Sequence, residues 1–309
     1  MPSSCYDDRF AEEVVLNGSL PVAAQVDLRR QPVEDVLERV EEALHVRLDR
    51  EALVRKRRSL GGRTERGTWV RIERRGFERI GAQGWNGIEA AAVVHGVAMP
   101  EWYQGVAWRE PGEPVMWRAD ELELTASPSV SKGALALEDP GLPEKWWEAL
   151  NTSLDALASQ QTPRIATPDT VTITQEQVTQ TLGAVFPVVA DTRIERWAPA
   201  HADLTWANVM GPEFSLIDWE DWGMAPRGLD AATLWGNALA VPGLADRVHR
   251  ERRTDLESRD GKLMSLFFLS KIVGPYAYEE DPLLAPARRE AARLVAELQL
   301  CRCPSRARR

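Results

Sequence analysis

The chain has few cysteines, no long apolar run and no excess of positive charge. Its three cysteines, Cys5, Cys301 and Cys303, form no metal-type set, so a disulfide scaffold is not expected and a reducing compartment fits. No apolar run approaches the roughly 20 residues that span a bilayer, and the acidic N-terminus has no signal-peptide core. The net charge of -9 argues against nucleic-acid binding. We therefore expect a cytoplasmic protein with neither nucleic-acid nor membrane partners.

What the chain does have is length, apolar residues and tryptophan. A length of 309 residues is long for one ordinary domain, so two lobes around a cleft are expected. A hydrophobic fraction of 44% is enough for a sizeable core. The twelve tryptophans could pack that core or line a pocket, and the acidic surface could serve solubility or attract cationic small molecules.

The first 125 residues read as a mostly β lobe. Residues 32–46 place Val33, Val36, Leu37, Val40 and Leu44 at helical spacing, which predicts an amphipathic helix. Residues 59–75 predict a hairpin with a glycine-rich turn. A helix is expected over 85–96, and two more strands over 102–108 and 115–124.

Residues 126–309 form the second predicted lobe, which is helical. After a connector over 126–143, apolar residues recur at helical spacing. Helices are expected over 144–159, 174–186, 229–240, 260–273 and 284–300. The sequence shows no internal repeat. Its two halves together predict an α+β fold.

The segment 201–223 carries the chemistry-bearing residues His201, Asp203, Asn208 and Asp218. A polar loop runs into a short strand, Val209–Met210, and a tight turn leads to a return strand ending at Asp218. Such a hairpin would bring Asp218 beside Asn208. Phosphoryl transfer needs a carboxylate to orient a hydroxyl and take its proton, and hard oxygen ligands for Mg²⁺. Asp203 suits the first role, and Asn208 and Asp218 suit the second.

This pattern resembles the catalytic and metal-binding loops of the aminoglycoside phosphotransferase and choline kinase superfamily. The resemblance implies a protein-kinase-like two-lobe fold, with Asp203 as catalytic base and with Asn208 and Asp218 holding Mg²⁺. It also implies that His201 organises the loop. Asp230, in the segment Ala225–Ala232, would open a helix and tie the catalytic loop down.

The same resemblance assigns nucleotide-binding roles in the first lobe. The turn Gly61-Gly62-Arg63-Thr64 stands where the family has its phosphate-covering loop. Arg71 stands where the family has a phosphate-binding Lys or Arg, and Glu89 would pair with it. The strand over 115–124 would lead to the hinge that contacts the base. The phosphoryl donor would be ATP or GTP.

The acceptor site is less defined. Trp206, Glu220, Asp221 and Trp222 are predicted near the reacting end, where acids and rings could hold a cationic substrate. The tryptophans could instead pack the hairpin against the helices. The sequence departs from the family at Ala202, where Gly is frequent, and at Thr205, where His is common. Neither change removes a group needed for catalysis.

The sequence thus predicts a small-molecule O-phosphotransferase, with an antibiotic as the expected acceptor and resistance as the expected role. A metabolite kinase for choline, sugars or homoserine is one alternative, and a non-catalytic nucleotide-binding protein is another. A protein kinase is disfavoured because Asp218 runs within eight residues into Pro226, leaving no activation segment. The choice between monomer and dimer stays open.

Overall fold

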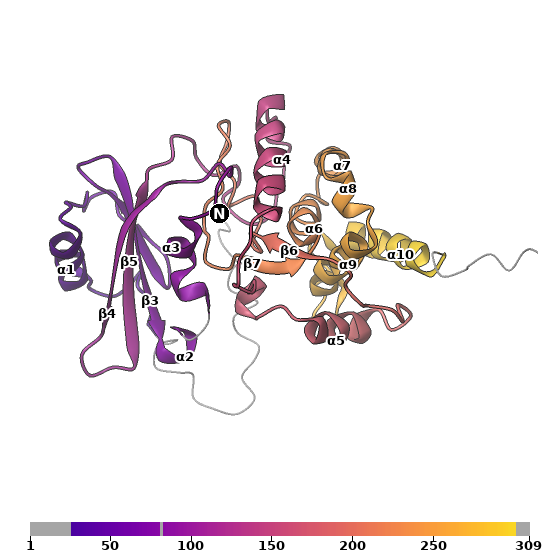
Figure 1. The fold of residues 1–309 in the computed structure, drawn as a ribbon, viewed down its shortest axis with the longest axis horizontal. Coiled ribbons are helices and arrows are strands. Elements are labelled where there is room, and N and C mark those ends of the chain that lie inside the picture. Colours follow the sequence, from indigo (N-terminus) through magenta and orange to yellow (C-terminus); the bar gives the residue numbers. More distant parts are fainter. Residues whose placement is uncertain (1–25, 81–82, 301–309) are drawn as a thin grey trace, which may run out of the picture. The chain divides into compact units, whose positions relative to one another are not determined.

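The computed structural model describes residues 26–80 and 83–300, so the three cysteines and both chain ends lie outside the described residues. The chain divides into two compact units (Figure 1). The first takes in the described residues up to Val94, Met99–Ala126 and Ser215–Glu220. The second takes in His95–Ala98, Ser127–Phe214 and the described residues from Asp221 onward.

The first unit is built on a five-stranded antiparallel sheet with the order β1-β2-β3-β5-β4. The helix α1 (Glu34–Leu44) confirms the predicted amphipathic helix, and the two strands predicted after residue 100 are confirmed as β4 and β5. The strand bounds are β1 (Val54–Arg55), β2 (Ser59–Arg63), β3 (Thr68–Gly76), β4 (Trp102–Arg109) and β5 (Val115–Glu123).

The two faces of this sheet differ in character. Val70 and Ile72 of β3 point to one face, where they join the buried side chains of α1 in a single apolar core. The alternate residues Arg71, Glu73 and Arg75 point to the other face because side chains alternate along a strand. In Figure 1, α1 and α3 (Gly87–Ala91) lie on opposite sides of the sheet. The charged face is thus turned away from α1.

The hairpin expected over 59–75 forms. The prediction placed Gly61 and Gly62 in its turn, and that placement is wrong. Gly61 and Gly62 lie inside β2, paired with Arg71 and Val70, rather than in the turn. A Cβ on Gly61 would come within 2.2 Å of the Trp69 ring, so the glycine leaves room for that indole. The turn itself is closed by Thr64, whose backbone N–H donates to the carbonyl of Thr68.

The helix predicted over 85–96 is also wrong in extent. The structure has a short α2 (Phe77–Ile80), a 3₁₀ turn η2 (Gln83–Asn86) and the five-residue α3. The chain then leaves the first unit, and His95–Ala98 belongs to the second. There, the Ala98 backbone donates to Ser153 Oγ of α4 (Glu144–Ala158). This packing competes with continuation of the helix.

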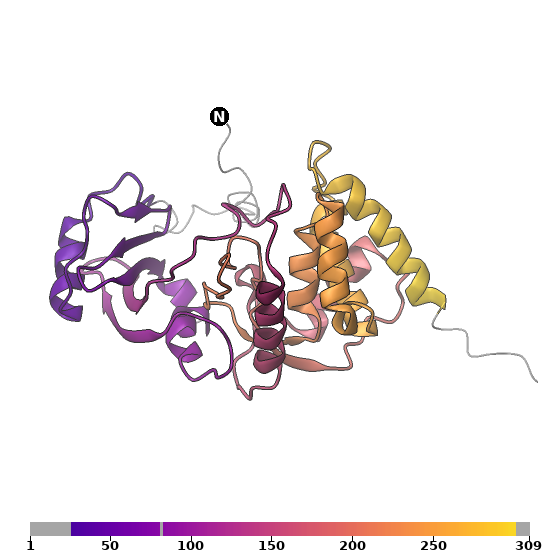
Figure 2. The same ribbon diagram turned by 90° about the horizontal axis from the view of Figure 1, so that it is seen from above.

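The second unit is helical, as predicted (Figure 2). α9 (Arg259–Val273) lies at its centre and packs against α5, α6, α8 and α10. Five predicted helices are confirmed, and two short ones, α7 and α8, were not predicted. The bounds are α4 (Glu144–Ala158), η3 (Pro168–Thr170), α5 (Gln175–Val185), α6 (Leu229–Gly236), α7 (Pro242–Glu251), α8 (Arg253–Leu256) and α10 (Leu284–Leu300). In residues 26–80 and 83–300, no helix combines the length and apolarity needed to cross a membrane.

A two-stranded antiparallel sheet in this unit was not predicted. β6 (Trp197–Ala200) pairs with β7 (Gly223–Pro226), and Ala200 lies opposite Gly223. The segment that begins with His201 therefore leaves β6 at the end of the small sheet where the chain enters β7. This placement fixes one end of the loop that carries Asp203.

Candidate active site

The loop after β6 brings Asp203 and Asn208 together. The Asn208 side-chain amide donates to the Asp203 backbone carbonyl at 2.9 Å and to Asp203 Oδ2 at 2.7 Å. Because both bonds use the NH₂ group, the Asn208 carbonyl oxygen is turned away from Asp203. Asn208 is buried and Asp203 is half-buried. The loop thus holds a carboxylate and an oriented amide oxygen as one unit.

Asp230 ties this loop to the start of α6. Its two carboxylate oxygens accept from the backbone N–H groups of His201 at 2.7 Å and Ala202 at 2.8 Å. This contact confirms the role expected for Asp230. Burial raises the pKa of Asp230 above its ordinary value, although the nearby His201 and the two N–H groups lower it in part.

The backbone conformation of Ala202 is one that glycine adopts most readily, which accounts for the glycine frequent at this position in the family that the sequence resembles. Its φ of 70° lies in the left-handed region, which costs a non-glycine residue about 1–2 kcal/mol. The Ala202 N–H donates to Asp230 in this conformation. The loop therefore keeps the glycine-type backbone with an alanine in place.

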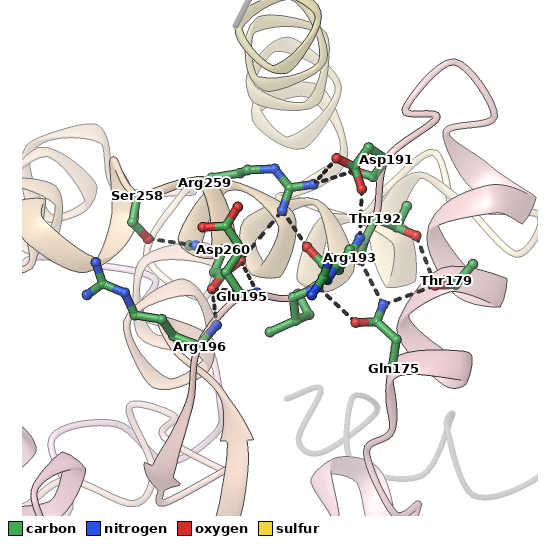
Figure 3. Close-up of polar contacts among 12 residues, drawn as sticks. Gln175, Thr179, Asp191, Thr192, Arg193, Glu195, Arg196, Ser258, Arg259 and Asp260 are labelled. Atoms are coloured by element: carbon green, nitrogen blue, oxygen red, sulfur yellow. Dashed lines mark hydrogen bonds and ion pairs between the residues drawn. The ribbon is translucent and has the colours of Figure 1, made fainter. Parts of the chain in front are cut away.

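The segment leading into β6 is held by side chains from α9 (Figure 3). Asp260 accepts from the backbone N–H groups of Glu195 at 3.1 Å and Arg196 at 2.7 Å. Arg259 forms an ion pair with Asp191 at 2.9 Å. The Asp260 carboxylate thus pairs two backbone N–H groups of this segment. Sequence reasoning missed Asp260, and the only signal was the serine at the helix N-cap, Ser258.

The predicted substrate residues of the second unit are mostly packed inside it. Trp206 is fully buried, stacks on Trp146 with 6.2 Å between ring centroids, and donates from Nε1 to the Leu234 carbonyl. Trp222 is buried under the guanidinium of Arg164. Both rings are buried, as expected if the tryptophans pack the hairpin against the helices, and the substrate role for them stays a prediction.

Asp221 and Glu220 also have partners within the protein. Asp221 accepts from Thr167 Oγ1 at 2.5 Å. Glu220, in the first unit, forms ion pairs with Arg71 and Arg75 and is 17% exposed. Each acid is thus engaged by its own unit rather than presented alone to a ligand.

In the first unit the structure brings Arg71, Asp218 and Glu220 together. Arg71 Nη1 lies 2.5 Å from Asp218 Oδ1, and Nη2 pairs with Glu220. Burial alone would lower the pKa of Arg71, but the carboxylates of Asp218 and Glu73 raise it above its ordinary value. Arg71 is therefore a fixed cation.

The expected ion pair between Arg71 and Glu89 does not form. Glu89 pairs with Arg118 of β5 at 3.1 Å, and its side chain is 50% exposed. The reason lies in the short α3, which places Glu89 beside β5. The remaining predicted nucleotide residues lie in the β2–β3 hairpin, with Arg63 exposed at the end of β2 and Thr64 buried against Thr68.

The donor set agrees with a hard metal held by few protein ligands. Asn208 offers an oriented carbonyl oxygen, and Asp218 offers a carboxylate. Among the residues that the structure describes, no group of three or more His, Cys, Asp and Glu is placed to hold a metal ion. Mg²⁺ commonly takes one or two protein ligands and completes its shell with phosphates and water. The oxygen atoms of Asn208 and Asp218 are thus of the chemical kind that Mg²⁺ binds.

No protein-family model matches the sequence, and no curated protein matches it significantly. Solved structures do match the fold. Amicoumacin kinase hAmiN, solved with AMP-PNP, Ca²⁺ and Ami, is 14% identical and aligns with a TM-score of 0.51 over 89% of this chain and 95% of its own.

Two aminoglycoside phosphotransferases match similarly. APH(4)-Ia is 11% identical, with a TM-score of 0.52 over 87% of this chain and 98% of its own. APH(2")-IIia, solved with GDP and kanamycin, is 14% identical, with a TM-score of 0.51 over 88% of this chain and all of its own. At sequence identities this low, the structural similarity supports a shared fold and nothing more. The chain shares the fold of these antibiotic kinases, with an antiparallel five-stranded sheet in its first unit and helices in its second.

Proposed function

We propose that this protein is a small-molecule kinase that moves the γ-phosphoryl group of Mg-ATP or Mg-GTP to a hydroxyl of its substrate. The observation that carries the proposal is the pairing of Asp203 with Asn208 on a loop fastened by Asp230. A general base beside an oriented amide oxygen is what a kinase loop requires. The fold shared with antibiotic kinases supports the same assignment.

In this proposal Asp203 orients the acceptor hydroxyl and takes its proton as the oxygen attacks the γ-phosphorus. The bond from that phosphorus to the β–γ bridging oxygen breaks, and the nucleoside diphosphate leaves with the electron pair. Asn208 and Asp218 would hold Mg²⁺, which neutralises charge on the phosphates when bound. Arg71 would contact the phosphates as a fixed cation.

We further propose an antibiotic as the acceptor, resistance as the biological role, and the cytoplasm, where nucleotide is present, as the location. The structural matches include kinases of amicoumacin and aminoglycosides, which supports this choice over a metabolite acceptor. One observation favours a non-catalytic nucleotide-binding protein instead. The predicted metal ligand Asp218 is already paired with Arg71.

The test is turnover by the purified protein. Mg-ATP or Mg-GTP is supplied with a pool of aminoglycosides, peptide and nucleoside antibiotics, macrolides, choline and sugars, and products are sought by mass spectrometry as one added phosphoryl group. We expect Asp203→Ala to lower turnover by about 10²–10⁴-fold, because it removes the general base. Nucleotide affinity should stay nearly unchanged.

The matched control is Asp246→Ala, which removes an exposed carboxylate on α7. It should leave both turnover and affinity unchanged. Nucleotide binding without product from any compound would favour the non-catalytic alternative. Failure to bind either nucleotide would overturn the proposal.

A further inference from the structure

The charged face of the N-terminal sheet holds one ion-pair network. Arg71, Glu73 and Arg75 alternate along β3, and Arg71 and Glu73 lie opposite Asp120 and Arg118 of β5. Two carboxylates and three guanidinium groups of the sheet thus share one face. Which carboxylate holds which arginine determines where each cation can point.

Glu220 joins two of these arginines. One of its carboxylate oxygens pairs with Arg71 Nη2 and the other with Arg75 Nη2. Arg75 is fixed further by Glu73 and by its position over the Trp85 ring. A carboxylate that bridges two arginines restrains the orientation of each guanidinium group. The N–H groups that do not contact the carboxylate can then donate to a second acceptor.

The backbone that carries Glu220 is itself fixed within the same unit. A Cβ on Gly87, the first residue of α3, would come within 2.2 Å of the Glu220 carbonyl oxygen and 2.5 Å of the Trp219 carbonyl oxygen. Trp219 is buried, and its Nε1 donates to the Leu216 carbonyl at 3.0 Å. Gly87 therefore allows the start of α3 to lie directly against residues 219–220.

Glu89, the alternative partner of Arg71, is engaged elsewhere. Its carboxylate pairs with Arg118, which is also bound by Asp120 through Nε at 2.7 Å and Nη2 at 2.6 Å. Asp120 accepts a further bond from Trp102 Nε1 at 2.8 Å. These contacts occupy Glu89 with a different arginine from the one it was expected to orient.

We infer that Glu220 is the positioning residue that aims Arg71 at the nucleotide phosphates, in the role that a glutamate of helix α3 was expected to fill. The inference rests on the proposed function, in which Arg71 binds those phosphates. Arg71 Nη1 pairs with Asp218 Oδ1 in the structure. When nucleotide binds, a phosphate oxygen replaces Asp218 on Nη1 while Glu220 keeps Nη2.

The experiment measures the Kd for Mg-ATP and Mg-GTP, and the KM and kcat for the product found above, in the full chain. Glu220→Gln should weaken nucleotide binding and raise the nucleotide KM by about tenfold, the scale of one charge-assisted hydrogen bond. The kcat should fall less than the KM rises. Glu220→Asp keeps the charge and should recover part of the affinity.

Glu113→Gln is the matched control, because it removes a carboxylate from Arg74 of the same strand on the opposite face. It should change nucleotide affinity less than twofold. Arg71→Gln combined with Glu220→Gln should be little worse than Arg71→Gln alone, because both act through the same cation. Thermal midpoints identify any variant that fails to fold, and Glu220→Asp then carries the comparison.

Three results would overturn the inference. Binding unchanged or tightened in Glu220→Gln would show that Glu220 only neutralises Arg71. A larger loss of nucleotide affinity in Glu89→Gln than in Glu220→Gln would show that Glu89 of α3 positions Arg71 instead. Fully additive losses in the double variant would show that Glu220 acts independently of Arg71. If the unaltered protein bound no nucleotide, the proposed function would fail instead, so the two failures are distinguishable.

Discussion

At the scale of single residues, the hydrogen bonds of Asp230 stabilise a loop that the backbone conformation of Ala202 destabilises. The left-handed backbone of Ala202 costs about 1–2 kcal/mol. A typical hydrogen bond contributes about 0.5–1.5 kcal/mol, and Asp230 accepts two such bonds from His201 and Ala202. The two bonds together offset the backbone strain, so the shape of the loop that carries Asp203 depends on Asp230.

The stability contribution of Asp230 should depend on pH in a defined direction. Its pKa is raised chiefly by burial, so the folded chain keeps a proton that the unfolded chain has lost. This contribution is largest below the unfolded pKa of about 3.9 and is lost as pH rises through the folded pKa. Asp230→Asn should cost about 2 kcal/mol near pH 4, and less as pH rises.

Urea unfolding of both proteins at a series of pH values gives the comparison. The free energy of unfolding of the unaltered protein should fall relative to that of Asp230→Asn across this window. Asp246→Asn, on the exposed face of α7, serves as the matched control. A cost that stays constant with pH would contradict the raised pKa.

At the scale of elements, the β2–β3 hairpin shows what sequence patterns can and cannot predict. Alternating β-formers located both strands, because side-chain alternation is a local property. The Gly61-Gly62 pair was read as a turn, since glycine favours turns. Its actual role is to make room for Trp69, a cross-strand neighbour that only the register reveals. The short α3 has a similar cause, because packing of the chain on α4 ends it.

Gly61→Ala tests this packing role. The added methyl would meet the Trp69 ring at 2.2 Å, so we expect a loss of about 1–3 kcal/mol in the free energy of unfolding. Gly133→Ala is the control, because no atom lies within 4 Å of its Cβ position. Urea unfolding measures both. Equal stability of the two variants would show that Trp69 moves aside freely.

At the scale of the whole molecule, the sequence anticipated the change from a β-rich to a helical half and the loop with Asp203 and Asn208. It did not anticipate that Ser215–Glu220 belongs to the first compact unit. The return strand predicted to end at Asp218 is not among the strands of the structure. Local pattern also carries no information on which distant residues such a segment packs against. The partners of Arg71 were therefore predicted from the wrong element, and Glu220 was assigned to substrate.

This discontinuity predicts the behaviour of an isolated fragment. Residues 26–126 expressed alone lack the six residues that carry Glu220, so Arg71 and Arg75 lose their shared carboxylate. Joining residues 214–221 through a flexible linker should raise the free energy of unfolding by about 1–3 kcal/mol. Urea unfolding of both fragments measures the gain. The same linked fragment with Glu220→Gln should lose part of it, and no gain from the linked segment would argue against the contact.

The same discontinuity limits how such a gene can be recombined. A crossover at residue 126 would take Arg71 and Arg75 from one parent and Glu220 from the other. A chimera would work only where both parents carry compatible charges at these positions. When the N-terminal half is exchanged, the six residues Ser215–Glu220 must come from the same parent, although they are encoded about 90 codons downstream of the crossover.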